Sequence, residues 1–437
     1  MTLGAVLLGK LAPWRNAATW RIAFSGGLDS TVLLHLLANL AKSHSLPALS
    51  ALHVHHGLQP AADAWPAHCQ AICDGLGVPL KIVRVQVQPG ASLERAAREA
   101  RYGAFIEATQ CSEVLLTAQH RDDQAETLLF RLLRGAGVRG LSAMPSQRAL
   151  GHGHLLRPLL NVSRAELERY ATEHQLRWID DPSNQDRQFS RNYLRHQVLP
   201  TLTERWPQAP ATIARSAAHL REAQELLDEL AQIDLAAAAG SNDFAWLGLP
   251  SLDLASLQKL SAARQRNALS NWLNQRTRMP DSDHWSGWED LRDATGDARP
   301  IWRLADGELH RSVGRIWWLS GPWLRTPSMI LSWSNPESSL TLPDNGLLTL
   351  TGQLPDGPLQ IRYRQGGEVM HLPERGHRDL KRLLNERGVP SFVRGRLPLL
   401  YRADQLLAVA GLRGLNGEAG EGWNLHWQAP SEDQGLS

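Results

Sequence analysis

Along the first 135 residues, short runs of apolar residues alternate with stretches in which apolar residues recur at helical spacing. Four short apolar runs have the length of buried strands and lie at 21–24, 48–54, 80–87 and 113–118. A stretch with helical spacing follows each of them, at 30–41, 62–77, 92–109 and 122–135. This βαβα order predicts an α/β fold with a parallel sheet and helices on both faces. Ligands of such sheets bind beyond the carboxyl ends of the strands, so we expect the functional loops directly after each strand.

The pattern changes after residue 206. A long amphipathic helix is predicted over 211–239, and more helical sequence follows it. Residues 299–321 predict a strand, an Asp-Gly turn and a second strand. The sequence therefore predicts three domains: an α/β domain at 1–206, a mainly helical domain at 207–335 and a small α+β domain at 336–437.

Composition narrows the class of protein. A chain of 437 residues with 43% apolar residues is long enough for two or three domains, each with its own core. No apolar run approaches the roughly 18 residues of a membrane span, and the amino-terminal patch lacks the basic start of a signal peptide. Three cysteines are too few for a disulfide framework. We therefore expect a cytoplasmic protein that does not enter a membrane.

Positive charge is concentrated near the carboxyl end. The net charge is only +2, but residues 361–402 hold 10 Lys and Arg against 4 Asp and Glu. A one-signed excess in a separable segment is typical of contact with a polyanion such as RNA, although runs of charge are more often plain solvated surface.

The first predicted strand leads into the motif Ser25-Gly26-Gly27-Leu28-Asp29-Ser30. Two glycines allow backbone N–H groups to crowd around an anion, and the helix that follows points its positive end at it. No Gly-Lys-Ser/Thr is present, so the loop is not a Walker A loop built around a γ-phosphate. The motif predicts a site for nucleotide phosphates. It resembles the PP-loop ATP pyrophosphatase superfamily, which implies that ATP is bound here and that AMP and pyrophosphate are released.

The loops after the later strands carry further candidate chemistry. The cluster His53-x-His55-His56 follows the second strand, and zinc is disfavoured there because no cysteine stands at partner spacing. Arg98, Arg101 and Tyr102 share one helical face that can meet a phosphate.

An acidic group begins the helix at 122–135. Asp122 and Asp123 start it and Glu126 follows one turn later, which exceeds what helix capping needs. Three carboxylates can hold Mg²⁺ against phosphates, or receive an ammonium group and later take its proton.

Six motifs together resemble the tRNA(Ile)-lysidine synthetase family. They occur in the family's order and are SGGLDS, HVHHGL, AREARYGAF, HRDDQAETLLFRLLRG, DPSN and RNYLRHQVLP. The segment 361–401 is similar to the family's carboxyl-terminal domain. The resemblance implies that ATP adenylates the wobble cytidine of the CAU anticodon of tRNA(Ile). The ε-amine of lysine then displaces AMP and forms lysidine.

The resemblance also implies roles for individual residues. The expected catalytic residues are Asp29, Arg98, Asp123 and Glu126. The expected nucleotide-binding residues are Ser25, Gly26, Gly27, Leu28, Asp29, Ser30 and His53. Mg²⁺ is expected with ATP, and its candidate ligands are Asp29, Asp122 and Asp123. The expected tRNA contacts are Arg191, Asn192, Arg195, Arg362, Arg364, Lys381, Arg382 and Arg394.

Three alternatives stay open at this point. A PP-loop tRNA thiolation enzyme would need a reactive cysteine pair or cluster ligands, and Cys69-x-x-x-Cys73 is not Cys-x-x-Cys. A small-molecule synthetase of the NAD or GMP type is disfavoured by the basic segment. A non-catalytic tRNA-binding protein is disfavoured by the intact SGGLDS and DDQAE motifs. The sequence leaves the oligomeric state open, a homodimer being one alternative.

Overall fold

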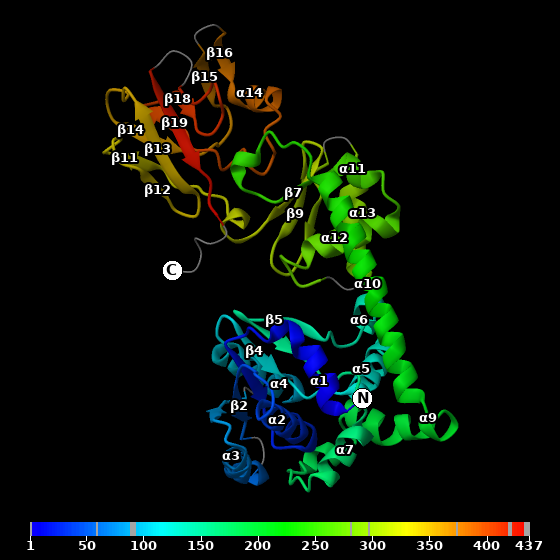
Figure 1. Ribbon diagram of the computed structural model, residues 1–437. Helices are drawn as coiled ribbons and strands as arrows, with labels where there is room; N and C mark the ends of the chain where they lie inside the picture. The colour runs from blue at the N-terminus through cyan, green and yellow to red at the C-terminus, as the bar shows by residue number, and fades with distance from the viewer. Residues whose placement is uncertain are drawn as a thin grey trace. The chain divides into compact units, whose positions relative to one another are not determined.

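The computed structural model describes residues 2–57, 60–87, 93–279, 282–295, 298–372, 375–417 and 422–431. It divides into two compact units, Met1–Leu226 and Leu227–Ser437. Figure 1 labels the elements of both units.

The amino-terminal unit is built on a six-stranded sheet with the order β3-β2-β1-β4-β6-β5. Its strands are β1 (Thr19–Ala23), β2 (Ala48–His55), β3 (Leu80–Arg84), β4 (Glu113–Leu116), β5 (Gln147–Leu150) and β6 (Gly153–Leu156). All neighbours pair in parallel except β5 with β6. The parallel α/β sheet predicted from the sequence is confirmed, although β3 ends at Arg84 and not at residue 87.

Helices cover both faces of this sheet, as Figure 1 shows. They are α1 (Leu3–Leu11), α2 (Leu28–Ala41), α3 (Trp65–Leu76), α4 (Leu93–Ala108), α5 (Arg121–Leu132), α6 (Val138–Leu141) and α7 (Arg164–Glu173). In β4, Val114 and Leu116 join the core under α2, while Leu115 joins a second core with Phe105 of α4. The alternation along one strand therefore supports a core on each side.

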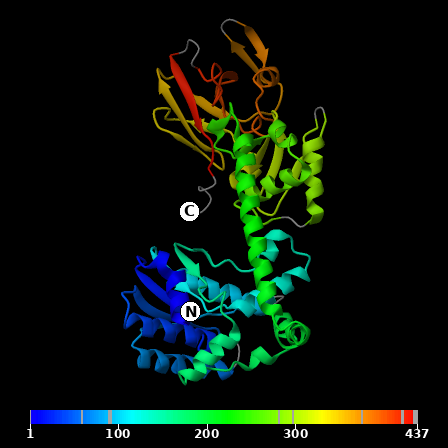
Figure 2. The same cartoon turned by 45° about the vertical axis from the view of Figure 1, so that its right-hand side comes forward.

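A further helical run completes the unit. It consists of α8 (Ser190–Tyr193), a π-helical turn (Leu194–Val198) and α9 (Leu199–Arg205). Helix α10 (Ala209–Ala239) then carries the chain into the second unit, and Figure 2 shows it as one uninterrupted helix.

The carboxyl-terminal unit begins with helices around a four-stranded sheet of order β7-β10-β9-β8. The elements are β7 (Ser251–Asp253), α11 (Leu254–Gln258), α12 (Ala262–Leu273), α13 (Ser286–Asp293), β8 (Ile301–Arg303), β9 (Glu308–Ser312) and β10 (Arg315–Leu319). Residues 299–321 hold three strands where the sequence predicts two, because a second turn at Val313-Gly314, both with positive φ, separates β9 from β10.

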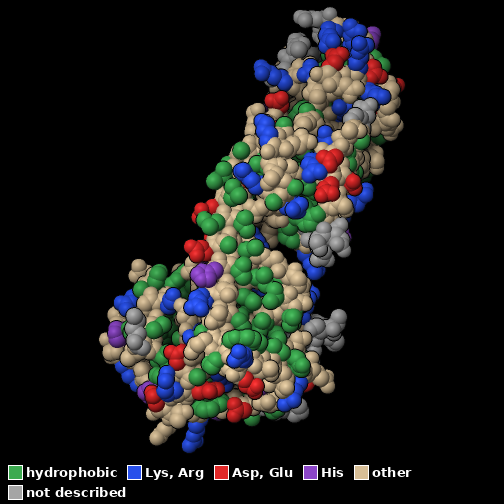
Figure 3. All heavy atoms as spheres, turned by 90° about the vertical axis from the view of Figure 1, so that its right-hand side faces the viewer, with side chains coloured by type: hydrophobic (Ala, Val, Ile, Leu, Met, Phe, Trp, Pro, Cys, Tyr) green, Lys and Arg blue, Asp and Glu red, His purple; other side chains and the backbone are tan. Residues whose placement is uncertain are grey.

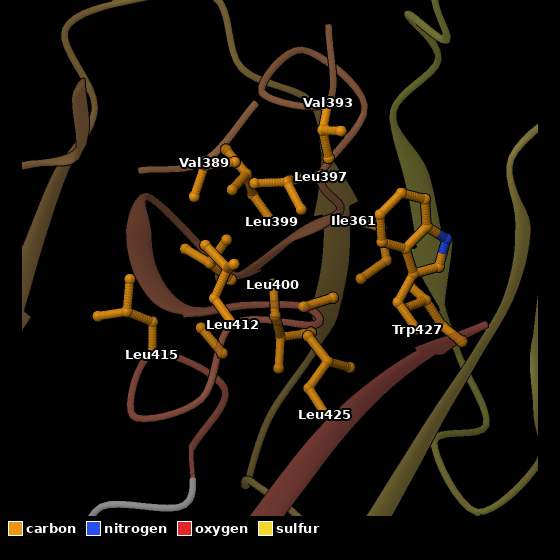
Figure 4. Packing of buried hydrophobic residues seen from close by; sticks show 14 of the residues in the cluster. Ile361, Val389, Val393, Leu397, Leu399, Leu400, Leu412, Leu415, Leu425 and Trp427 are labelled. Atoms are coloured by element: carbon orange, nitrogen blue, oxygen red, sulfur yellow. The ribbon is translucent and has the colours of Figure 1, made fainter. Parts of the chain in front are cut away.

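Two antiparallel-rich sheets and one helix complete this unit, with the orders β11-β14-β17-β18-β15-β16 and β12-β13-β19. The elements are β11 (Leu331–Trp333), β12 (Leu340–Leu342), β13 (Gly346–Gly352), β14 (Leu359–Arg362), β15 (Val369–Leu372), β16 (Gly376–Asp379), α14 (Leu380–Glu386), β17 (Leu399–Arg402), β18 (Gln405–Val409) and β19 (Trp423–Gln428). Their core, drawn in Figure 4, packs Ile361, Leu400 and Trp427 together. The same core includes Phe244 and Trp317, whereas Leu269, Trp288 and Leu309 belong to a separate core around the four-stranded sheet.

Among the described residues, no helix combines the length and the apolar character that crossing a membrane requires.

Candidate active site

The site lies where the order of the central sheet reverses. From β1 the chain proceeds outward through β2 and β3, and then returns to β4 on the other side of β1. The loops after β1 and β4 therefore diverge and leave a crevice beyond the strand ends. These loops carry the SGGLDS motif and the start of the acidic helix α5.

The two glycines of the first loop have different tasks. Gly26 has φ of +84°, and a Cβ there would lie 2.6 Å from Cδ1 of Ile179. Gly27 caps α2 with extended backbone, and a Cβ there would meet nothing closer than Ser25 Oγ at 3.5 Å. The first position needs glycine for the fold. The second leaves open space that a phosphate can approach.

Hydroxyl groups fix the shape of the loop. The Oγ atoms of Ser25 and Ser30 lie 3.0 Å apart, and Ser30 also donates to the Gly27 carbonyl at 3.0 Å. The buried Thr31 hydroxyl donates to the same carbonyl at 3.0 Å. These contacts hold the loop against the first turn of α2, with the helix N-terminus turned to the crevice.

A first cavity of about 370 Å³ opens over this loop. Six of the predicted nucleotide residues line it: Ser25, Gly27, Leu28, Asp29, Ser30 and His53. Gly26 is absent from its lining and packs behind the loop instead. His53 Nδ1 donates to the Phe24 carbonyl at 2.9 Å, and burial lowers the pKa of its ring. The size and the lining suit a small ligand such as a nucleotide.

The acidic residues of α5 meet an arginine from the π-helical turn. Arg195 Nε donates to Glu126 Oε1 at 2.6 Å, and its Nη2 donates to Asp123 Oδ1 at 2.9 Å. Arg195 belongs to the group of expected tRNA contacts, yet the structure brings it to the expected catalytic residues. π-helical turns occur frequently at functional sites, because the wider turn redirects a side chain.

Burial shapes the charges of this cluster. Burial raises the pKa of the Glu126 carboxyl, and Arg195 offsets only part of that effect. Burial lowers the pKa of Arg195, but the nearby carboxylates raise it by more, so that the pKa of Arg195 is raised overall. The pKa of Glu126 is thus shifted toward neutral pH, as is typical of carboxylates that act as general bases.

Arg164 is a site residue that sequence reasoning missed. Its Nη1 lies 3.0 Å from each carboxylate oxygen of Asp29, and its backbone N–H donates to Asp122 at 3.0 Å. It is the first residue of α7 and lies between Ser163 and Glu166, which together form the capping box of that helix. The capping-box pattern Ser-x-x-Glu was the available signal for this helix start.

His120 was missed as well. This buried residue precedes α5, and its ring nitrogens lie 3.5 Å from Asp123, 3.7 Å from Asp122 and 3.8 Å from Asp29. Burial alone would lower the pKa of His120, but the three carboxylates outweigh it and raise the pKa. The acids around His120 therefore favour the protonated form of its ring.

A second cavity of about 510 Å³ shares a wall with the first. Asp123, Arg101 and Arg195 line both cavities. Arg98, Glu126, Arg191 and Asn192 line the second cavity and not the first, and Glu126 also lines a third cavity. Asp122 lines neither of the first two, and it faces that third cavity with His120 and Arg164. The three expected Mg²⁺ ligands therefore do not share one cavity.

Some predicted residues already hold the fold in place. The Asn192 amide donates to the carbonyls of Ser183 and Asp186, both at 2.8 Å, which ties down the DPSN turn. The exposed Arg98 guanidinium lies over the Tyr102 ring, 4.8 Å from its centre.

The five remaining predicted residues lie in the carboxyl-terminal unit. Three of them are half-buried and engaged within the unit: Arg362 stacks on Tyr401, Arg364 faces Glu368 and Arg394 donates to the Val389 carbonyl. Lys381 and Arg382 are exposed in the first turn of α14. Figure 3 shows Lys and Arg side chains gathered at the end of this unit that carries β15, β16 and α14.

Three family models match the chain. A PP-loop domain matches residues 6–202, a TilS substrate binding domain matches 252–317 and a TilS substrate C-terminal domain matches 359–427. The tRNA(Ile)-lysidine synthase of Pseudomonas fluorescens is 73% identical over 430 residues, which cover 98% of this chain and 97% of the relative. The chain belongs to the tRNA(Ile)-lysidine synthase family. The synthase of Coxiella burnetii is 40% identical and covers 97% of this chain and 96% of its own.

The comparison with solved structures gives a more distant likeness. A U34-tRNA thiolase from Methanococcus maripaludis, solved with its [4Fe-4S] cluster, covers 50% of this chain and 78% of its own at 19% identity, with a TM-score of 0.42. Membership of the lysidine synthase family makes this chain an ATP-dependent ligase with a PP-loop domain.

Two of the three cysteines of this lysidine synthase family member are poorly suited to act as nucleophiles. Cys69 and Cys73 are buried, and burial raises their pKa values to about 12 and about 11. A thiol with such a pKa holds almost no thiolate at neutral pH. We expect the Cys69→Ala/Cys73→Ala/Cys111→Ser variant to keep turnover within about threefold of wild type, with some loss of stability from the two core positions. Lysidine formation measured on folded protein checks this, and its abolition would implicate a thiol.

Proposed function

We propose that this protein joins the ε-amine of lysine to C2 of the wobble cytidine in the CAU anticodon of tRNA(Ile), at the expense of ATP. One observation carries the proposal. A phosphate-binding loop and a pair of partly buried carboxylates line adjoining cavities that share Asp123 and Arg195. Names of relatives at up to 73% identity support the same reaction.

The first cavity is assigned to ATP. Backbone N–H groups at Gly27 and Leu28 and the hydroxyls of Ser25 and Ser30 would hold the pyrophosphate part, at the N-terminus of α2. Gly26 shapes the loop from behind. His53, neutral because of its burial, would face the nucleoside.

The first chemical step places AMP on the cytidine. The O2 oxygen of the base attacks the α-phosphorus, so an O–P bond forms and the bond to pyrophosphate breaks. Negative charge develops on the leaving pyrophosphate, and the positive end of the α2 helix dipole would stabilise it. Arg98, at the wall of the second cavity, is assigned to the phosphate that the base approaches.

The second step exchanges AMP for lysine. Asp123 and Glu126 now hold the guanidinium of Arg195, which shows that a cation fits between them. We assign the same carboxylates to the ammonium group of lysine. Glu126, whose pKa burial raises, takes its proton. The free amine attacks C2, and O2 leaves with AMP.

Mg²⁺ is assigned to the phosphates of ATP. Among the described residues no cluster of three or more His, Cys, Asp or Glu side chains is arranged to hold a metal ion alone. Asp29 and Asp123 do line the first cavity, and one or two carboxylates with phosphate oxygens are the usual Mg²⁺ ligands. When bound there, the ion would offset phosphate charge.

The remaining assignments concern the tRNA and its setting. We assign residues 1–206 to catalysis, 207–335 to substrate binding and 336–437 to tRNA docking. Arg191, Asn192 and Arg195 would face the anticodon loop. The contacts assigned to the last domain are Arg362, Arg364, Lys381, Arg382 and Arg394. We place the reaction in the cytoplasm, and a homodimer stays a prediction.

The Lys381→Ala/Arg382→Ala variant should weaken tRNA binding and flatten its salt dependence. Each lost phosphate contact lowers the log–log slope by about 0.7 to 0.9. Point substitutions are the appropriate test, because truncation near Pro343 would remove most of the core that also contains Phe244, Trp317 and Trp323. Titrations of tRNA at several salt concentrations measure the slope, and Arg303→Ala, an exposed arginine outside the basic segment, serves as the control. If wild type, the double variant and the control all gave equal slopes, Lys381 and Arg382 would not contact tRNA phosphates.

The nucleotide product tests the proposed chemistry. ATP labelled at the α-phosphate, incubated with tRNA(Ile) and lysine, should yield labelled AMP with pyrophosphate in equal amount. Labelled ADP would contradict the assignment of the loop to pyrophosphate.

A further inference from the structure

A groove of about 490 Å³ lies on the amino-terminal unit, apart from the three cavities of the site. The end of α5 and the segment that leads into α8 form it, and its lining includes Phe130, Leu133, Arg134, Arg187, Tyr193 and Leu194. Large apolar groups are open to solvent here: Leu133 is 76% exposed and Tyr193 is 52% exposed. Contiguous exposed apolar surface is typical of sites that bind a partner or a ligand.

The charge of the groove points to an anionic partner. Its lining contains two arginines and no Asp or Glu. The Arg134 guanidinium lies over the Phe130 ring, 5.2 Å from its centre. Elsewhere on α5, burial lowers the pKa of Arg131, and the charges of Arg191 and Arg98 lower it further. Aromatic faces beside guanidinium groups are the combination that holds unpaired nucleotides.

The same two helical segments line the groove and the second cavity. On α5, Glu126 faces the cavity and Phe130 follows one turn, about 6 Å, further along the helix. In the second segment Arg195 lines the cavity, while Tyr193 and Leu194 line the groove. The groove and the second cavity therefore lie along the same two helical segments, and their lining residues are neighbours in sequence on the second segment.

We propose that this groove holds an unpaired nucleotide of the anticodon loop next to the cytidine that is modified, with its base on Tyr193 and its phosphate near Arg134 or Arg187. This assignment rests on the proposed function. It adds a binding subsite that fixes the register of the loop, so that one base alone enters the second cavity.

Tyr193→Ala should lower the affinity for tRNA(Ile) by roughly 5- to 150-fold, the range expected when one base–aromatic stack is removed. An isolated anticodon stem-loop should lose affinity by the same factor. Tyr193→Phe should bind both RNAs as wild type does, since it keeps the ring. ATP affinity should be unchanged in all three proteins, which also shows that they are folded.

Trp206→Ala is the matched control, because Trp206 is an aromatic residue of the same unit, is 60% exposed and lines no cavity of the site. Unchanged affinity of Tyr193→Ala for both RNAs would overturn the proposal and leave the groove as a surface for another protein. A loss with intact tRNA but not with the stem-loop would overturn it too, by placing Tyr193 against a different part of the tRNA. Failure of the proposed function is distinct, since wild type itself would then form no lysidine.

Discussion

Glu126→Gln should reduce lysidine formation by roughly a hundredfold or more while ATP affinity stays near that of wild type. Both oxygens of Glu126 are engaged by Arg195, and the residue is 4% exposed. Glutamine keeps the volume but can neither balance a cation nor accept a proton, and the loss of a positioned base costs about 10²- to 10⁴-fold. Asp123→Asn should lose a similar factor, because Asp123 holds the same guanidinium.

Steady-state rates over a range of lysine concentrations measure this effect. The matched control is Glu99→Gln, which makes the same change on the exposed face of α4, in a pair with Arg95. Thermal unfolding of each variant separates catalysis from folding, since each substitution removes one charged partner of Arg195. If lysine KM and turnover are both unaffected, the acidic residues only cap α5.

Gly26→Ala should destabilise the protein and abolish ATP binding, whereas Gly27→Ala should leave stability unchanged and weaken ATP binding alone. At Gly26 the new methyl group meets Ile179 and Cys69, and φ of +84° is unfavourable for alanine. Strain of this kind costs about 1–3 kcal/mol, and overpacking adds a similar amount. At Gly27 the backbone is extended and the methyl group would make only ordinary contacts, such as 3.5 Å to Ser25 Oγ, so we expect it to obstruct the bound phosphate without straining the loop.

Denaturant unfolding and ATP titration of the two variants give the comparison. The pair distinguishes a glycine that shapes the loop from one that admits the ligand. Equal stability of Gly26→Ala and wild type would show that the loop adapts. Unchanged ATP affinity in Gly27→Ala would move the phosphates away from the first turn of α2.

Local patterns predicted the elements that lie next to one another in sequence. Strand β1, the SGGLDS loop and helix α2 form one continuous signal of apolar run, glycine pair and helical spacing. The parallel sheet followed from the repetition of such units. The acidic start of α5 was also recognisable, because three carboxylates in two turns exceed the needs of a helix cap.

Contacts between distant segments were beyond this reasoning. Arg164 is 135 residues from its partner Asp29, and Arg195 is 69 residues from Glu126. Helical periodicity placed Arg191, Asn192 and Arg195 on one face, but periodicity does not tell what that face meets. The sheet at β7–β10 was missed in part for the same reason, since β7 pairs with a strand more than 60 residues later.

The transfer of labelled lysine to two tRNAs with the same CAU anticodon tests the central claim most directly. Purified protein, ATP and labelled lysine are incubated with tRNA(Ile) or with the elongator methionine tRNA, and the label retained on RNA is counted with and without ATP. The account predicts ATP-dependent labelling of tRNA(Ile) at the wobble cytidine, and little labelling of the methionine tRNA. Absence of labelled tRNA(Ile) from folded protein that binds ATP would contradict it.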